Sequence, residues 1–271
     1  AEAPSSALTA QRELRPVQDH PSGGVYEGQW LGDARDGQGV QAWPDGAKYV
    51  GQFVGDKISG RGLFTHHDGD VYDGEWLDGQ AHGFGKYVSA AGGACYEGEW
   101  KEDKQHGVGT EQWQDGAVYT GQYEWAAKEG TGNFVWSDGS QYEGTFKANN
   151  IHGKGDYRWA DGRTYSGQWD ANRMHGRGRF VWKDGRAYEG CYVADTKEGH
   201  GVFSWPDGQT FDGFWKGGKQ HGAGTFTFAS GRKRKGVWEN GKRIRWDDDE
   251  PVSDVNVTCR VSVQNSSTFA R

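Results

Sequence analysis

The chain has 271 residues, of which 34% are hydrophobic and 46 are glycine, and its formal net charge is −7 at pH 7. This negative charge argues against a general nucleic-acid-binding protein, which would carry a basic stripe. No apolar run approaches the roughly 18 residues that a membrane-spanning helix requires. Low hydrophobicity is typical of disordered chains, but 14 Trp, 12 Tyr and 12 Phe residues placed in register indicate a folded protein instead.

Three segments follow one another along the chain. Residues 1–24 are expected to form an extended N-terminal arm, with a short helix around Ser6 to Leu14. Residues 25–245 form an array of sequence repeats, and residues 246–271 are expected to form an acidic linker and a strand-like tail. Alternating Val and Cys residues from Asp254 to Gln264 predict a β-strand in this tail, which could mediate self-association.

The array consists of one sequence motif, here called the phrase, which is repeated about ten times. The phrase recurs every 23 residues, apart from one 24-residue step between the third and fourth copies, and a degenerate tenth copy begins at Arg234. Copies 1 to 9 begin at Tyr26, Tyr49, Tyr72, Tyr96, Tyr119, Tyr142, Tyr165, Tyr188 and Phe211. Such a period is typical of a protein built from stacked supersecondary units.

Each copy reads as two short strands. In copy 7, Tyr165, Gly167 and Trp169 alternate with polar residues, which predicts a strand with one apolar face. A polar turn from Asp170 to His175 is expected to follow, and then a second strand whose inward face holds Gly176, Gly178, Phe180 and Trp182. Asp-Gly pairs close most copies and are a strong hairpin signal, because glycine accepts the positive φ of tight turns.

These patterns predict an all-β fold, an elongated single-layer antiparallel sheet of about ten 23-residue hairpins. We expect the aromatic rings to lie over the glycines of neighbouring strands, so that one layer buries apolar surface without a second sheet. Stacking shares this burial between hairpins that would be marginal alone. About twenty strands at roughly 4.8 Å would extend on the order of 95 Å.

The phrase Tyr-x-Gly-x-Trp, a polar turn, Gly-x-Gly and an Asp-Gly turn resembles the MORN (membrane occupation and recognition nexus) repeat from Tyr26 to Gly241. The resemblance implies antiparallel hairpins that often bind partners or self-associate. MORN arrays occur in junctional scaffolds, ciliary and cytoskeletal proteins, lipid kinases and a histone methyltransferase. Two groups of positions depart from the pattern: His66 and Ser89 where an aromatic residue is usual, and Asp36, Ser59, Glu129 and Glu198 where other copies have His. The aromatic surface is therefore expected to be interrupted in the early copies.

Aromatic pairs at the end of each second strand are the main candidate site. One interpretation makes them the minimal core of a one-layer sheet. The other makes them an incompletely covered trough that binds a partner protein. The candidate partner-binding residues are Phe134, Trp136, Tyr157, Trp159, Phe180, Trp182, Phe203, Trp205, Phe226 and Phe228.

A basic cluster near the end of the array is a second candidate site. Anionic lipid headgroups or an acidic partner could dock there. The alternative is a solvated end of the array, neutralised by the acidic run Asp247 to Glu250. The cluster comprises Arg232, Lys233, Arg234, Lys235, Lys242, Arg243 and Arg245.

Nothing in the sequence predicts a cofactor, a metal site or catalysis. One histidine per copy cannot bring three or four ligands to one point, so turn hydrogen bonding or packing is expected for His82, His106, His152, His175 and His221. The three cysteines form no Cys-x-x-Cys pair. The Gly-x-Gly elements lead into strands rather than helices and so do not predict phosphate binding. Carboxylates alternate with the aromatic residues on an open polar face.

The expected function is a non-enzymatic scaffold or adaptor that binds other proteins, beside a membrane or within a large assembly, and not nucleic acid. One alternative is the regulatory MORN segment of a lipid kinase or methyltransferase, and another is a glycan-binding aromatic array. We expect a cytoplasmic protein associated with the cytoskeleton, a cilium or a membrane, or an organellar one if Ala1 follows a cleaved targeting segment.

Overall fold

All regular elements in the structure are β-strands. The computed structural model describes residues 11–19, 21 and 23–247, and these residues contain 21 strands and no α-helix. The described part of the chain accordingly offers no helix that could cross a membrane. Two compact units divide the chain between Ser137 and Asp138. The predicted all-β class and hairpin repeat are confirmed.

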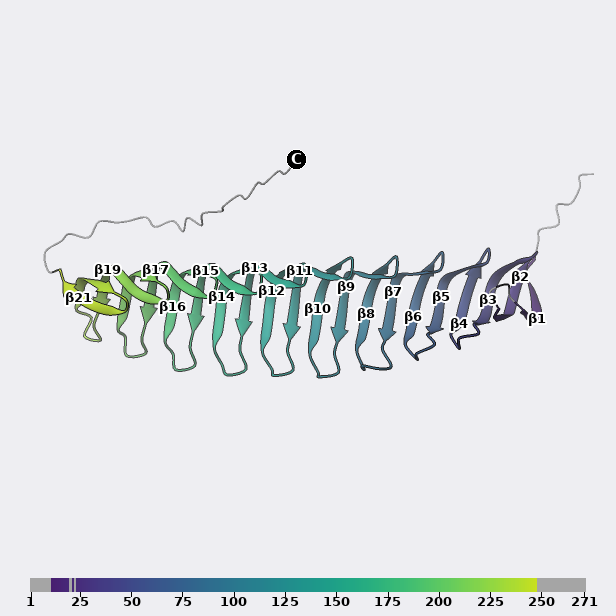
Figure 1. Ribbon diagram of the computed structural model, residues 1–271, viewed down its shortest axis with the longest axis horizontal. Helices are drawn as coiled ribbons and strands as arrows, with labels where there is room; N and C mark the ends of the chain where they lie inside the picture. The colour runs from purple at the N-terminus through teal and green to yellow at the C-terminus, as the bar shows by residue number, and fades with distance from the viewer. Residues whose placement is uncertain (1–10, 20, 22, 248–271) are drawn as a thin grey trace, which may run out of the picture. The chain divides into compact units, whose positions relative to one another are not determined.

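The first unit contains eleven strands, each antiparallel to the next in chain order (Figure 1). Strands of seven residues alternate with strands of nine from β2 onward. The strands are β1 (Glu13–Asp19), β2 (Val25–Leu31), β3 (Ala34–Ala42), β4 (Lys48–Val54), β5 (Lys57–Thr65), β6 (Val71–Leu77), β7 (Gln80–Val88), β8 (Cys95–Lys101), β9 (Lys104–Gln112), β10 (Val118–Glu124) and β11 (Ala127–Val135).

The second unit contains ten strands, again paired antiparallel in chain order. The strands are β12 (Gln141–Lys147), β13 (Asn150–Arg158), β14 (Thr164–Asp170), β15 (Arg173–Val181), β16 (Ala187–Val193), β17 (Thr196–Ser204), β18 (Thr210–Lys216), β19 (Lys219–Thr227), β20 (Lys233–Glu239) and β21 (Lys242–Trp246). They follow the same alternation as far as β20, and β21 has five residues.

Strand β1 lies where an extended arm and a short helix were expected. It pairs antiparallel with β2, from Glu13 opposite Trp30 to Asp19 opposite Val25. Glu13 and Leu14 are therefore in a strand, not in a helix. Gln11 and Arg12 belong to no regular element. Residues 6–10 of the expected helix and the expected strand of the C-terminal tail lie outside the described residues.

The two turns of each copy differ from the sequence expectation. The expected polar turn from Asp170 to His175 is in fact a two-residue turn, because β14 ends at Asp170 and β15 begins at Arg173. Ala171 and Asn172 both have positive φ, 46° and 66°, which is the type I′ geometry that matches strand twist. The Asp-Gly pairs instead lie in five-residue loops, such as Trp159 to Arg163, where Gly162 N donates to the Trp159 carbonyl at 3.0 Å. The two-residue turn is thus formed by Ala and Asn in copy 7, whereas some other copies have glycine there, as at Asp78-Gly79 in copy 3.

The core of each unit is a row of fully buried rings that lie over glycine pairs. Tyr165 is 1% exposed, and its hydroxyl donates to the Gln168 carbonyl at 2.9 Å. Its ring covers Gly167 and Gly178, which face each other across β14 and β15. The same arrangement recurs at the first residue of copies 1 to 9, with Phe211 in place of tyrosine in copy 9. The expectation that rings lie over neighbouring glycines is confirmed.

A polar side chain supports the backbone where the two strands of a copy shift register. In copy 7 the register changes after Gly167, and Gly176 has a φ of 60°. The Gln168 side chain covers this glycine and accepts a hydrogen bond from Arg177 N at 2.8 Å. Equivalent acceptors are Gln29, Gln52, Glu99, Gln122 and Thr145. The sequence analysis missed this role, although a Gln or Glu three residues into most copies was its signal.

Candidate functional site: the aromatic ladder

A continuous series of ring contacts crosses the second unit. We call it the aromatic ladder, and it comprises Tyr157, Trp159, Phe180, Trp182, Phe203, Trp205, Phe226, Phe228 and Trp246. Neighbouring ring centroids are 4.4 Å apart between Tyr157 and Trp159, and 5.3 Å apart between Trp159 and Phe180. The structure thus brings together the eight candidate residues that belong to this unit.

Each copy contributes one ring from a strand and one from a loop. Phe180 is in β15, directly opposite Tyr165 of β14 and Tyr188 of β16, so it shares the face of the buried tyrosines. Trp182 was expected in the same strand but is the first residue of the five-residue loop, where its N–H donates to the Arg186 carbonyl at 2.8 Å. The ladder therefore runs alongside the row of buried tyrosines that forms the core.

Exposure differs among the rings of the ladder. Phe180 and Phe203 are 6% and 7% exposed, whereas Trp159, Trp182 and Trp205 are only partly buried. Phe180 and Phe203 thus belong to the core, whereas the strand rings of Tyr157 and Phe226 are partly buried, as the loop tryptophans are. The partly buried rings retain surface that a partner can cover. The core interpretation is confirmed for Phe180 and Phe203, and binding of a partner by the partly buried rings stays a prediction.

Cationic side chains lie over several ladder rings. The Arg163 guanidinium is 5.2 Å from the Trp159 ring centroid, and Arg186 is 5.7 Å from that of Trp182. Each arginine is also paired with the aspartate of its own loop, Asp161 at 2.7 Å and Asp184 at 2.8 Å. The ladder is therefore apolar in its rings and cationic at its border.

The basic cluster near the end of the array is divided between surfaces. Arg232 lies over Phe228, at 5.9 Å, while Arg234 and Arg243 lie over Trp246, at 4.5 Å and 4.3 Å. Arg245 is paired with Asp247. Lys233 and Lys235 flank Arg234 in β20 and so alternate to the opposite face; Lys242 is exposed. Three of the seven basic residues thus extend the ladder, which the sequence reading as one patch did not predict.

Trp246 is the ladder residue that sequence reasoning missed. It lies in β21, 6.0 Å from Phe228 and 5.7 Å from Trp238 between ring centroids. The sequence analysis placed this residue in the acidic linker because it falls outside the regular repeat. A tryptophan five residues after the last glycine of the tenth copy was the available signal.

The remaining two candidate residues belong to the first unit. Phe134 and Trp136 stack at 4.4 Å, and Phe134 also stacks on Trp113 at 5.3 Å. In the earlier copies, His66 keeps a ring contact with Phe64 at 4.6 Å. Ser89 forms none and instead hydrogen-bonds to Asp70 at 3.2 Å.

The histidines do not converge. Among the described residues no group of three His, Cys, Asp or Glu side chains could hold a metal ion. His152 Nδ1 lies 3.5 Å from Asp170, and the His106 ring packs against Trp125 at 5.4 Å. The Nδ1 atoms of His106 and His221 are buried and have no hydrogen-bond partner in the described part of the chain. Packing is thus their main contact.

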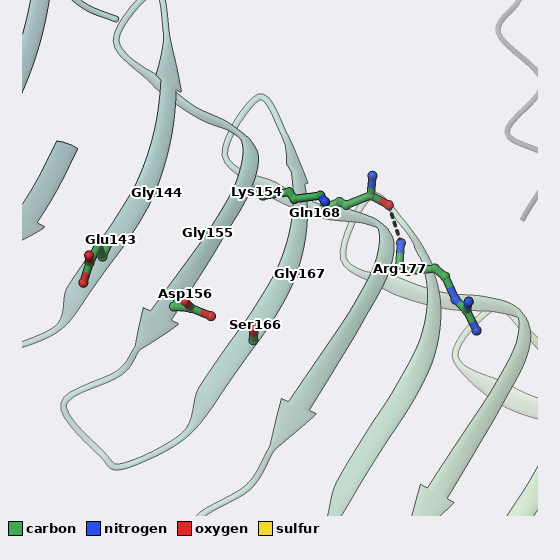
Figure 2. A pocket seen from close by; sticks show the side chains of 9 residues that line it. All are labelled: Glu143, Gly144, Lys154, Gly155, Asp156, Ser166, Gly167, Gln168 and Arg177. Carbon is green, nitrogen blue, oxygen red and sulfur yellow. Dashed lines mark hydrogen bonds between the residues drawn. The ribbon is translucent and has the colours of Figure 1, made fainter. Parts of the chain in front are cut away.

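On the polar face of the second unit, a shallow hollow of about 650 Å³ lies over the bare backbone of Gly144, Gly155 and Gly167 (Figure 2). Glu143 and Asp156 stand directly opposite each other on β12 and β13. Figure 2 shows these carboxylates beside Ser166, with the basic residues farther along the strands. Both carboxylates are exposed, so nothing here prepares one of them for acid–base work.

The fold and the ladder define a class: a tandem β-hairpin repeat protein whose aromatic residues lie on one face of the sheet. The model of the MORN repeat matches nine consecutive segments, residues 26–48, 49–71, 72–94, 96–118, 119–141, 142–162, 165–185, 188–210 and 211–231. The chain belongs to the MORN repeat family.

Comparison with other proteins adds no closer relative. A search of curated protein sequences finds no match. Among solved structures, the chain is similar to the TCP10 domain of Danio rerio CPAP in complex with a peptide of Danio rerio STIL, with 13% identity, a TM-score of 0.46, and coverage of 88% of this chain and 99% of that one. The same domain without the peptide has 12% identity and a TM-score of 0.42, with coverage of 77% of this chain and 98% of that one. The TCP domain of Drosophila melanogaster SAS-4, in complex with a proline-rich motif of Ana2, has 14% identity and a TM-score of 0.33. The match covers 80% of this chain and 96% of that one. Likenesses at these TM-scores carry no argument about function.

Proposed function

We propose that this protein is a non-enzymatic scaffold that binds a segment of a partner protein along the aromatic ladder. The observation that carries the proposal is the row of partly buried tryptophans, Trp159, Trp182 and Trp205, which repeat one copy apart beside a completed core. Their exposed ring surface gives the fold little further burial, whereas aromatic anchors contribute strongly to protein interfaces. A position in the cytoskeleton or in a large assembly suits such a scaffold.

The dispersal of the basic cluster favours a protein partner over a membrane. A lipid surface is recognised by cations that gather on one side of the protein. Here Arg234 and Arg243 lie over Trp246, and Arg245 is paired with Asp247. These groups accordingly extend a surface that combines rings with positive charge.

The test uses substitutions that the fold already accommodates elsewhere. Histidine occupies the loop-ring position in copy 2, where His66 packs on Phe64, so Trp159→His combined with Trp205→His removes exposed aromatic surface and keeps a ring. Glu143→Lys, on the opposite polar face, is the control. Random 14-residue peptides displayed on phage are selected on the immobilised wild-type chain, and the affinities of enriched peptides are then measured for each variant.

We expect the double variant to weaken these peptides by about tenfold or more, with little change in melting temperature, and the control to bind as the wild type does. Peptides that bind all three proteins equally, or that are lost only in Glu143→Lys, would place the binding surface elsewhere and refute the proposal.

A further inference from the structure

The ammonium group of Lys197, in β17, lies inside the aromatic ladder. Its Nζ is 4.8 Å from the ring centroid of Trp182, 5.0 Å from Phe203, 4.9 Å from Trp215 and 5.1 Å from Tyr188. Rings on this scale of distance attract a cation through their π faces. Two of the four, Trp182 and Phe203, are ladder residues.

Lys197 has rings around it but no counter-ion among the residues that the structure describes. In the described part of the chain the structure gives its ammonium no hydrogen bond and no ion pair. Burial, with a smaller contribution from the positive charge of Arg186, lowers the pKa of Lys197 to about 8. Glu198, the next residue, is directed away and accepts a hydrogen bond from Gly217 N at 2.9 Å. Tyr188 and Tyr192 on β16 stay neutral because burial raises the pKa of each hydroxyl.

In copy 5 the lysine at the same position of the repeat has a carboxylate partner from the chain itself. Lys128 is the equivalent residue of copy 5, and its Nζ is 4.7 Å from the Trp113 ring centroid and 5.1 Å from that of Tyr119. There a carboxylate oxygen of Glu111, from the preceding copy, lies 2.8 Å from the ammonium. The molecule itself therefore combines an aromatic surround, a lysine and a carboxylate.

In copy 1 the equivalent residue is Arg35, which also has polar partners. Its guanidinium donates to Gln41 Oε1 at 2.8 Å and to Asp56 Oδ1 at 3.3 Å. Like Lys197, it lies over rings, those of Tyr26 and Phe53. A cation at this position is thus accompanied by an acceptor in both of these copies.

Around Lys197 all three acceptor positions are apolar. Phe180 stands where Lys128 has Glu111, Phe203 stands where Arg35 has Gln41, and Gly218 stands where Arg35 has Asp56. The Lys197 Nζ is not among the fully buried polar atoms without a partner, so it retains some exposed surface.

We propose that Lys197 receives a carboxylate from the partner protein, and that the ladder selects a segment in which an Asp or Glu stands between apolar side chains. The inference rests on the proposed function and specifies its partner. The ammonium supplies a charge-assisted hydrogen bond to the carboxylate, and the tryptophans on either side accept the apolar neighbours. Arg163 and Arg186 are already paired with the aspartates of their loops, whereas Lys197 has no carboxylate partner among the described residues.

The experiment repeats the selection of phage-displayed 14-residue peptides on four full-length proteins: wild type, Lys197→Met, Lys197→Arg and Lys216→Met. Methionine is chosen because Met174 occupies this position in copy 7, so the fold accommodates it. Lys216 is an exposed lysine of β18 and serves as the matched control. Each enriched peptide is also made with its acidic residue changed to Gln or Asn, which completes a double-mutant cycle.

We expect wild type and Lys216→Met to enrich peptides with an acidic residue among apolar ones. Removing either partner of the pair should weaken binding by about tenfold or more, and removing both should cost little beyond that. Lys197→Arg should retain most of the affinity. Calorimetry of the wild type at pH 8.5 in two buffers of different ionisation enthalpy should show proton uptake on binding, because the carboxylate raises the pKa of Lys197.

Three outcomes would overturn the inference. Peptides whose Gln versions bind equally well would mean that the ladder binds partners without Lys197. No enrichment on any protein would refute the proposed function itself. Retention of phosphatidylserine vesicles by wild type and not by Lys197→Met, with peptides unaffected, would assign Lys197 to lipid instead.

Discussion

The Tyr96 ring covers Gly109 so closely that a β-carbon built on that glycine would lie 2.3 Å from the tyrosine hydroxyl oxygen. Gly109→Ala should therefore destabilise the fold by about 1–3 kcal/mol, the usual cost of overpacking a core. Gly92→Ala is the matched control, because Gly92 has open space around its β position and no positive φ. Urea denaturation checks both, and equal midpoints would show that the rings move aside freely.

Removing a single hydroxyl group from the core should lower the free energy of unfolding by less than adding a methyl group to a core glycine. Tyr142 donates to the Thr145 carbonyl at 3.0 Å, so Tyr142→Phe should lose about 1 kcal/mol of unfolding free energy. Copy 9 already folds with Phe211, and the reverse change Phe211→Tyr should gain a similar amount. Chemical denaturation measures both, and a loss in Tyr142→Phe as large as that of a ring deletion would contradict the hydrogen-bond account.

The acceptor beside the register shift should be replaceable by another acceptor only. Gln168→Ala removes the partner of Arg177 N, now 2.8 Å away, and we expect a loss of about 1 kcal/mol. Gln168→Glu should be nearly neutral, because Glu99 serves Val108 N in the same way at 2.9 Å. Thermal unfolding and amide hydrogen exchange at Arg177 distinguish the two variants, and similar exchange rates in both would rule out this role.

Stability should depend on pH through Lys197. Burial lowers its pKa from 10.5 to about 8 in the folded protein, so between these values the unfolded chain binds more protons and stability rises with pH. Lys197→Met lacks this dependence. We expect the variant to be more stable than the wild type at pH 7 and this difference to shrink by pH 9.5. The buried tyrosines titrate in the opposite sense above pH 10, but both proteins contain them. A constant difference across this range would contradict the predicted titration.

The repeat and its glycines were sufficient to predict the hairpins, the ring-over-glycine core and most ladder residues, because each of these features recurs in every copy. Features that occur once could not be found by averaging over copies. Trp246 lies beyond the regular pattern, and β1 has none of the repeat's glycines. The two-residue turns were misplaced because only some copies mark them with glycine, as at Gly79, whereas Ala171 and Asn172 adopt positive φ without one. The role of Lys197 could not be predicted from its sequence position. It follows from a comparison with Lys128, once the structure shows which residues surround each lysine.

The Lys128–Glu111 pair also bears on how such a chain avoids pairing the wrong copies. Nearly interchangeable hairpins could in principle associate out of order, since glycines and tyrosines would meet equally well one copy along. A shift of one copy would place Lys128 against an apolar residue and leave the Glu111 carboxylate alone among rings. Arg35 with Asp56, and Asp36 with Gly55 N, would be separated in the same way. The few polar contacts that differ from copy to copy thus favour pairing of each hairpin with its correct neighbours.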